Sequence, residues 1–207
     1  MKRIAHIHRK TKETDISVKL NLDGTGKSSI RTGIPFLDHM LTLFAKHGLF
    51  DLVVKAKGDT QVDYHHTFED AGICLGKAID KALDKRGGIC RYGALSLPMD
   101  EVLANVRASI DISGRPYLDF HAQVTTADKK ITRQKFPFRR KTDIEYAKEF
   151  FKGMTAHARI TLHIDLLKPG EIHHVNEAVF KGVAVALRQA VAVHVRAKGV
   201  SSTKGNL

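Results

Sequence analysis

The chain has 207 residues, 43% of them hydrophobic and 27% charged, a composition typical of a globular protein that buries a substantial core. No apolar run approaches the roughly 20 residues that cross a bilayer, and the start lacks a signal-peptide core, so we expect neither a membrane nor a secreted protein. Two cysteines, Cys74 and Cys90, favour a reducing cytoplasm over a disulfide framework, while the net charge of +12 raises the question of a nucleic-acid partner.

The first half of the chain predicts strands and helices in alternation. Alternating apolar and polar residues predict strands at residues 16–22 and 49–56, and an Asp-Gly turn at residues 23–26 suggests a hairpin after the first. Apolar residues at helical spacing predict helices over residues 34–47 and 71–83.

The second half repeats this pattern. It predicts strands at residues 106–112 and 159–166, a Ser-Gly turn at 113–116, and helices over 144–157 and 179–191. The helices lie 110 and 108 residues after their counterparts. Each half therefore reads strand, strand, helix, strand, helix, with room for further short strands, and the chain is an internal duplication.

Each half also carries a His-His-x-x-Glu pentad, at residues 65–69 and at residues 173–177. The first His and the Glu share one helical face, because residues i and i+4 stack, whereas the second His points elsewhere. Imidazole and carboxylate groups together bind Mn, Fe, Co or Zn, and two pentads suit two separate ions. One pentad alone could be the solvated start of a helix, but two copies in register favour a metal site.

We therefore expect an α+β fold of two half-domains, residues 1–90 and 91–207, that together form one functional unit. Each would be an antiparallel sheet with two helices, packed so that four helices lie between two sheets. Ligands would then come from facing elements of both halves, so neither half would have an independent site.

Two further patterns bear on the site and its partners. Aligning the first predicted helix of each half places His39 opposite Glu149, and His47 opposite His157. Residues 129–141 are strongly basic and interleaved with aromatics, as in some single-strand nucleic-acid binders. A solvated loop before a helix is the competing interpretation. No zinc-finger, RRM or helix-turn-helix pattern accompanies the segment, so we expect no nucleic-acid partner.

Ordered motifs run along essentially the whole chain: RKTKET at 9–14, TGIPFLDHML at 32–41, DYHHTFED at 63–70, PMDE at 98–101, DISGRPY at 111–117, HHVNEA at 173–178, FK at 180–181 and SSTKG at 201–205. Together they resemble the imidazoleglycerol-phosphate dehydratase family of histidine biosynthesis. The resemblance implies conversion of imidazole glycerol phosphate to imidazole acetol phosphate and water. It also implies two Mn2+ ions per subunit and a homo-oligomer of twenty-four subunits built from trimers.

The resemblance also implies roles for individual residues. One ion would take His39, His65, Glu69 and His173, and the other would take His66, His174, Glu177 and Glu149. The substrate phosphate would be held by Arg91, Arg115, Ser202 and Lys204. Glu13 and His47 match positions beside the reacting carbons and are the acid and base candidates, and His39 would also contact the substrate. Position 149 departs from the family pattern, because many members have His there, but a carboxylate also binds Mn.

Two other classes of protein compete with this interpretation. A basic nucleic-acid-binding or metal-storage protein could use the pentads structurally, but structural metal sites are usually closed and rich in Cys. A hydrolase with two bridged ions would need bridging carboxylates, whereas the duplicated pentads suggest separated ions. The sequence therefore favours the dehydratase.

Overall fold

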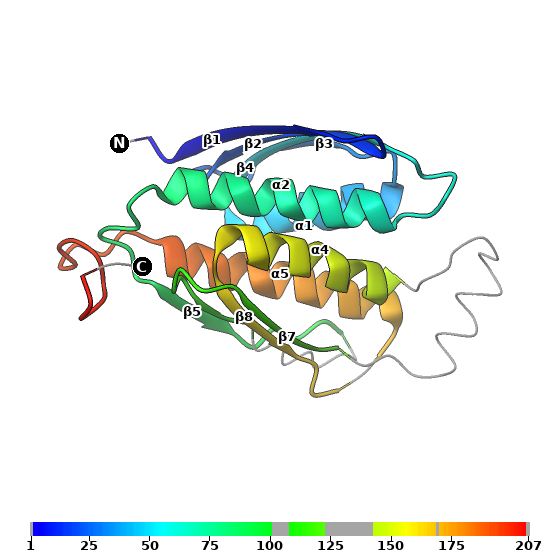
Figure 1. Cartoon of the computed structure of the whole chain (residues 1–207). Coiled ribbons are helices and arrows are strands. Elements are labelled where there is room, and N and C mark those ends of the chain that lie inside the picture. The colour runs from blue at the N-terminus through cyan, green and yellow to red at the C-terminus, as the bar shows by residue number, and fades with distance from the viewer. Residues whose placement is uncertain (1, 101–107, 123–142, 169, 206–207) are drawn as a thin grey trace.

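Two four-stranded sheets enclose a layer of helices in the computed structural model, which describes residues 2–100, 108–122, 143–168 and 170–205 (Figure 1). The first repeat contains β1 (Ile4–Lys10), β2 (Thr14–Asn21), β3 (Ser28–Arg31), α1 (Pro35–Gly48), β4 (Asp51–Gly58) and α2 (His65–Leu83). The second contains β5 (Tyr92–Leu95), β6 (Ala108–Asp111), β7 (Tyr117–His121), α4 (Asp143–Ala158), β8 (Thr161–Asp165) and α5 (Ile172–Val191).

The two sheets have the same topology. Their strand orders are β1-β2-β4-β3 and β5-β6-β8-β7, so each element of the first repeat has its counterpart at the same place in the second. Leu20 pairs with Leu52 in the first sheet, and Ile110 pairs with Leu162 in the second. The expected duplication, with helices between two sheets, is confirmed. The division at residue 90 stays a prediction.

The expectation of antiparallel sheets was wrong for one strand pair in each repeat. β3 runs parallel to β4, and β7 runs parallel to β8, because the helix between the two strands returns the chain in its original direction. The expectation of hairpins at residues 23–26 and 113–116 was also wrong. Those turns are present, but β4 lies between β2 and β3, and β8 lies between β6 and β7. A turn residue alone does not determine which strands pair.

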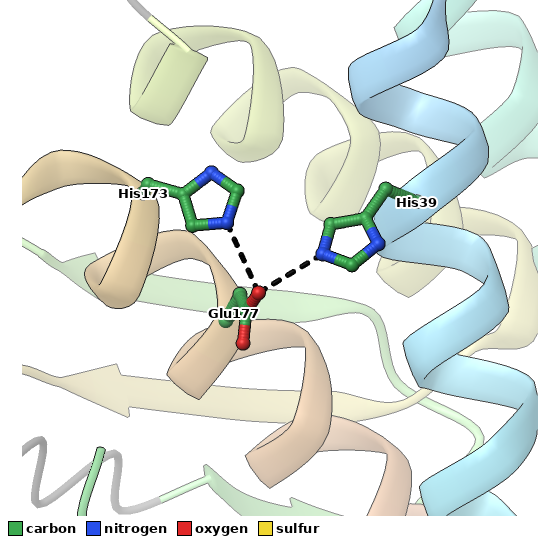
Figure 2. A group of neighbouring side chains, drawn as sticks. All are labelled: His39, His173 and Glu177. Atoms are coloured by element: carbon green, nitrogen blue, oxygen red, sulfur yellow. Dashed lines mark hydrogen bonds and ion pairs between the residues drawn. The ribbon is translucent and has the colours of Figure 1, made fainter. Parts of the chain in front are cut away.

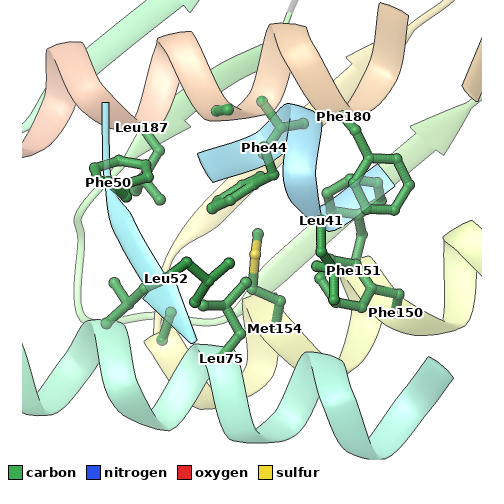
Figure 3. Packing of buried hydrophobic residues seen from close by; sticks show 14 of the residues in the cluster. Leu41, Phe44, Phe50, Leu52, Leu75, Phe150, Phe151, Met154, Phe180 and Leu187 are labelled. Atoms are coloured by element: carbon green, nitrogen blue, oxygen red, sulfur yellow. The ribbon is translucent and has the colours of Figure 1, made fainter. Parts of the chain in front are cut away.

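The core lies where the helices of one repeat pack on those of the other, α2 on α4 and α1 on α5. Figure 3 shows the rings of Phe150, Phe151 and Phe180 gathered between α4 and α5, and the last two have centroids 4.8 Å apart. All three side chains are fully buried. Because the same buried cluster continues from these rings across the α2–α4 and α1–α5 contacts, neither repeat has a complete core of its own.

The helix layer also orients the pentads. In Figure 1, α2 and α5 both begin at the right-hand end of the layer, so the first turns that carry the pentads lie at the same end of the molecule. The connection from the third strand to the first helix is longer in the second repeat than in the first, and it contains the basic segment. That segment, residues 129–141, lies entirely outside the described residues.

Candidate active and metal site

The second pentad forms the first turn of α5. Glu171 caps the helix, and its side chain accepts a hydrogen bond from the backbone N–H of His174 at 3.3 Å. One turn later, Oε1 of Glu177 lies 3.0 Å from Nε2 of His173, the pairing expected at i and i+4. The helix start therefore presents an imidazole and a carboxylate side by side.

A histidine from the other repeat completes this group. His39 lies in the first turns of α1, which Pro35 opens and which Asp38 ties back to the backbone N–H of Thr32 at 2.7 Å. Its Nε2 is 2.9 Å from Oε1 of Glu177, and its ring stacks on that of His173 with centroids 5.6 Å apart (Figure 2).

These three residues have the geometry of a cation site. In the part of the chain that the structure describes, His39, His173 and Glu177 form the one group of at least three potential ligands whose atoms lie within 4.8 Å of one another. Both histidines are partly exposed and the carboxylate is buried, so the group opens toward solvent on one side. The ligands come from both repeats.

Lys181 holds the carboxylate of this group in its ionised form. Its Nζ lies 2.6 Å from Oε2 of Glu177, one helical turn away, and both side chains are nearly buried. Burial by itself would raise the pKa of Glu177, but the hydrogen bonds from Lys181 and His39 lower it to about 2. Lys181 lies in the FK motif at residues 180–181, and its i+4 spacing from Glu177 is the sequence signal for this pairing, which was not predicted.

The first pentad has a different set of partners. At the start of α2, Nε2 of His65 lies 3.3 Å from Oε2 of Glu69. Nδ1 of His66 lies 3.0 Å from Asp59, and its Nε2 lies 3.8 Å from Oε1 of Glu13, which stands on the turn between β1 and β2. The hydrogen bond to Asp59 raises the pKa of His66. Asp59 is a further residue that the sequence analysis missed.

The grouping of ligands differs from the two sets that the resemblance implied. His39 and His173 lie together, as expected, but with Glu177 rather than with His65 and Glu69. Glu149 lies on α4, where Lys152 approaches its Oε2 at 3.7 Å, and no group of three described ligands includes it. The roles of Glu149 and of both sets as metal ligands stay predictions.

His47, an expected acid or base, lies in the last turn of α1 and is half-buried. Burial lowers its pKa, and the positive charge of Lys181 lowers it further, against the opposing effect of Glu177. The ring is therefore held neutral near pH 7 and can accept a proton.

The four expected phosphate ligands share one cavity of about 870 Å³, although they come from three separate stretches of the chain. The cavity is lined by Arg91, Tyr92, Ser113, Gly114, Arg115, Arg159, Ser201, Ser202, Thr203 and Lys204. Asp111 holds the guanidinium of Arg91 at 2.7 and 3.2 Å, and Arg91 donates to the Ser201 carbonyl at 2.6 Å. This cavity can take a small anion.

The cavity and the histidine group lie at opposite ends of α5. The backbone N–H of Arg91 donates to the carbonyl of Ala190 at 2.8 Å, near the end of the helix, whereas Glu177 lies near its start. At the rise of an α-helix, these two positions on α5 are roughly 20 Å apart.

No described helix is long and apolar enough to cross a membrane.

Comparison with known proteins decides the family. The model of the imidazoleglycerol-phosphate dehydratase family matches residues 32–187. The chain belongs to this family. It is 52% identical over all 207 residues, and over the full length of both chains, to the imidazoleglycerol-phosphate dehydratase of Lachnoclostridium phytofermentans. It is 52% identical over 206 residues, 99% of this chain and all of the relative, to that of Methylorubrum populi.

Solved structures of the imidazoleglycerol-phosphate dehydratase family agree with this fold. The enzyme from Staphylococcus aureus is 35% identical with a TM-score of 0.75, and the match covers 92% of this chain and 99% of that one. The enzyme from Pyrococcus furiosus is 35% identical with a TM-score of 0.76, and the match covers 97% and 100%. The expectation of a hydro-lyase of histidine biosynthesis is confirmed.

Proposed function

We propose that this chain dehydrates imidazole glycerol phosphate to imidazole acetol phosphate in the cytoplasm and that it requires two Mn2+ ions per subunit. The observation that carries the metal requirement is the ionised Glu177 carboxylate between His39 and His173, at 2.9 and 3.0 Å. A buried anion flanked by two imidazoles, one from each repeat, is a donor set that fits a borderline divalent ion.

The remaining ligands would be His65, His66, Glu69, His174 and Glu149. Bound divalent ions would stabilise negative charge on the imidazole ring of the substrate, which makes the neighbouring C–O and C–H bonds easier to break. Asp63 supports the first pentad, because its side chain accepts the backbone N–H of His65 at 2.7 Å and so holds the start of α2. Glu171 does the same for the second.

The anion cavity would bind the phosphate of the substrate. Arg91 is fixed by Asp111 and would present an oriented cation. Arg115 is exposed, and its guanidinium makes no hydrogen bond or ion pair within the described part of the chain, so it is available to a ligand. A guanidinium binds a phosphate dianion through two aligned donors, and Lys204 and Ser202 add a point charge and a hydroxyl.

Glu13 and His47 would transfer the protons. Dehydration breaks one C–O bond, whose oxygen leaves as water after gaining a proton, and one C–H bond, whose proton passes to a base. The enol that results becomes the ketone by moving its hydroxyl proton to carbon. His47 is held neutral and suits the base, while Glu13 stands exposed beside His66, where it can reach a bound substrate.

The distance between the two proposed parts of the site supports a homo-oligomer. The separation of roughly 20 Å along α5 far exceeds the three-carbon chain between the imidazole and the phosphate of the substrate. One chain therefore cannot engage both ends of the molecule. We propose that a second copy supplies the phosphate cavity, in an assembly of twenty-four subunits built from trimers.

Metal removal and replacement test this function. The chelated protein should lose dehydratase activity and its large assembly, because the ligands come from both repeats, and Mn2+ added back should restore both. Light scattering and product formation are the measurements. Full assembly and an unchanged rate after chelation would refute the metal requirement.

Mixing two impaired variants, assayed at a low substrate concentration, tests the shared site. Glu177→Gln lacks the metal ligand and Arg115→Ala lacks the phosphate ligand. When the two are unfolded, mixed and refolded together, some sites will combine an intact Glu177 with an intact Arg115 from another copy, and activity should reappear. A mixture with no more activity than its components would place the whole site within one chain.

A further inference from the structure

Asp59 contacts two residues of the proposed site at once. It follows the last residue of β4, and its carboxylate lies 3.0 and 3.2 Å from Nδ1 of His66. Its backbone N–H donates to the carbonyl of Glu13 at 3.1 Å, which continues the β2–β4 ladder beyond the pair Thr14 and Gly58. Asp59 therefore connects His66, an expected metal ligand, with Glu13, an acid or base candidate.

The carboxylate determines which ring nitrogen of His66 carries a hydrogen. A carboxylate only accepts hydrogen bonds, so Nδ1 must be the donor, and the neutral ring then has its lone pair on Nε2. That Nε2 is the atom that faces Glu13 at 3.8 Å. The arrangement is the one by which carboxylates orient metal-binding histidines.

The loop that carries Asp59 is held tightly against α2. Gly58 lies so close to the helix that a Cβ there would stand 2.0 Å from Oγ1 of the buried Thr67. The carbonyl of Asp59 accepts the N–H of Val62 at 2.8 Å, and its side chain is only 18% exposed. A carboxylate fixed in this way can hold the ring of His66 in one orientation.

The sequence position equivalent to Asp59 holds no carboxylate in the second repeat, and His174, the counterpart of His66, has a carboxylate from a different segment near it, with Oδ2 of Asp100 4.0 Å from its Nε2. The offsets of 110 residues for the strands and 108 for the pentads place the counterpart of Asp59 within residues 167–169, which are Leu, Lys and Pro. The two pentads are therefore supported differently, although they are alike in sequence. This asymmetry makes a selective test possible.

We propose that Asp59 is a positioning residue that fixes the tautomer and orientation of His66 and so selectively strengthens the ion that His66 would bind. The inference rests on the proposed function. It assigns Asp59 no contact with the substrate.

The test compares Asp59→Asn with a matched control, Asp63→Asn. Asp63 lies in the same loop, but its carboxylate accepts the backbone N–H of His65 at 2.7 Å rather than a ring nitrogen. Both variants lose the same charge. Mn2+ binding to the chelated proteins is followed by calorimetry and by electron paramagnetic resonance.

Wild type should bind two ions per chain. Asp59→Asn should bind one ion as wild type does and the other about 10- to 100-fold more weakly. Asp63→Asn should bind both ions with wild-type affinity, because the side-chain oxygen of asparagine can still accept the backbone N–H of His65 and hold the start of α2. Asp59→Glu keeps a carboxylate and should recover part of the loss, while excess Mn2+ should restore the rate of Asp59→Asn.

The outcomes distinguish a failure of the proposed role of Asp59 from a failure of the proposed function. Two ions bound equally well by wild type and by Asp59→Asn would overturn the role of Asp59 and leave the proposed function standing. Equal weakening of both ions in Asp59→Asn and in Asp63→Asn would overturn it as well, because a general loss of charge would then suffice. A wild type that bound no Mn2+ would overturn the proposed function together with this inference.

Discussion

Glu177 accepts a hydrogen bond of 2.9 Å from His39, which lies 138 positions earlier in the chain. This bond joins the start of α5 to the start of α1 and so connects the two repeats at the site itself. Lys181 forms an ion pair with the other carboxylate oxygen, and this pair keeps Glu177 ionised in a nearly buried position. The pentads therefore differ in environment, and their variants should differ too.

Glu69→Gln and Glu177→Gln should each lose most dehydratase activity and about half of the bound metal, since each removes a charged ligand from one ion. Their stabilities should differ. Glu177→Gln leaves Lys181 without its buried partner and should cost about 3 kcal/mol in free energy of unfolding. Glu69→Gln changes a side chain that is 37% exposed and should cost under about 1 kcal/mol. Elemental analysis and urea unfolding measure the two effects. Unchanged metal and turnover in either variant would remove that residue from the site.

Arg115→Ala should raise KM more than Lys204→Ala does, because a guanidinium offers two aligned donors to phosphate. Loss of such a partner costs about 2 to 3 kcal/mol, or roughly 30- to 100-fold in apparent affinity. Arg159→Ala is the control, since Arg159 lines the same cavity but its guanidinium is held by Asp80 at 2.7 Å. Steady-state kinetics at constant metal content decide the matter. Similar KM values for Arg115→Ala and wild type would return Arg115 to the role of an exposed turn residue.

Cys74 should make the protein less stable at alkaline pH. Burial raises the pKa of its thiol from the ordinary 9.0 to about 11, so the folded state favours the protonated thiol. This stabilisation is complete below pH 9 and is lost as the pH rises from 9 through 11. This pKa shift corresponds to about 2 to 3 kcal/mol in the free energy of unfolding.

Cys74→Ala removes the titration. Its stability relative to wild type should therefore rise by about that amount between pH 8 and pH 11, on top of a constant cost for the lost side chain. Urea unfolding under reducing conditions at several pH values measures the difference. Parallel curves for the two proteins would mean that the Cys74 thiol does not titrate differently on folding.

Gly72→Ala should destabilise the protein although alanine favours helices. A Cβ at residue 72 would stand 2.1 Å from the carbonyl oxygen of Phe150, where α2 crosses α4. The gain in helix propensity is about 1 kcal/mol. The steric cost of overpacking is about 2 to 3 kcal/mol and should exceed this gain. Gly87→Ala is the control, because the nearest atom to its Cβ would be 3.6 Å away. Thermal unfolding that ranked the two variants equally would mean that the helix crossing can relax.

The sequence by itself determined the local features of this protein. The helices, the duplication and the strands β2, β4, β6 and β8 follow from periodicity, whereas β1, β3, β5 and β7 were not located from the sequence. The pairing of His173 with Glu177 also follows, because side chains four residues apart meet on any helix. The motifs also singled out Arg91, Arg115, Ser202 and Lys204, which line one cavity in the structure, and their role in binding phosphate stays a prediction.

Only the tertiary structure decided the relationships between distant segments. It inserted β4 between β2 and β3, grouped His39 with Glu177, and set the cavity lined by Arg91 and Arg115 at the far end of α5 from the histidines. It also brought Asp59 against His66. Such contacts depend on how one repeat packs against the other and on where each strand joins its sheet. Neither is encoded in the spacing of residues along the chain, because the burial of apolar surface that drives this packing has no direction of its own.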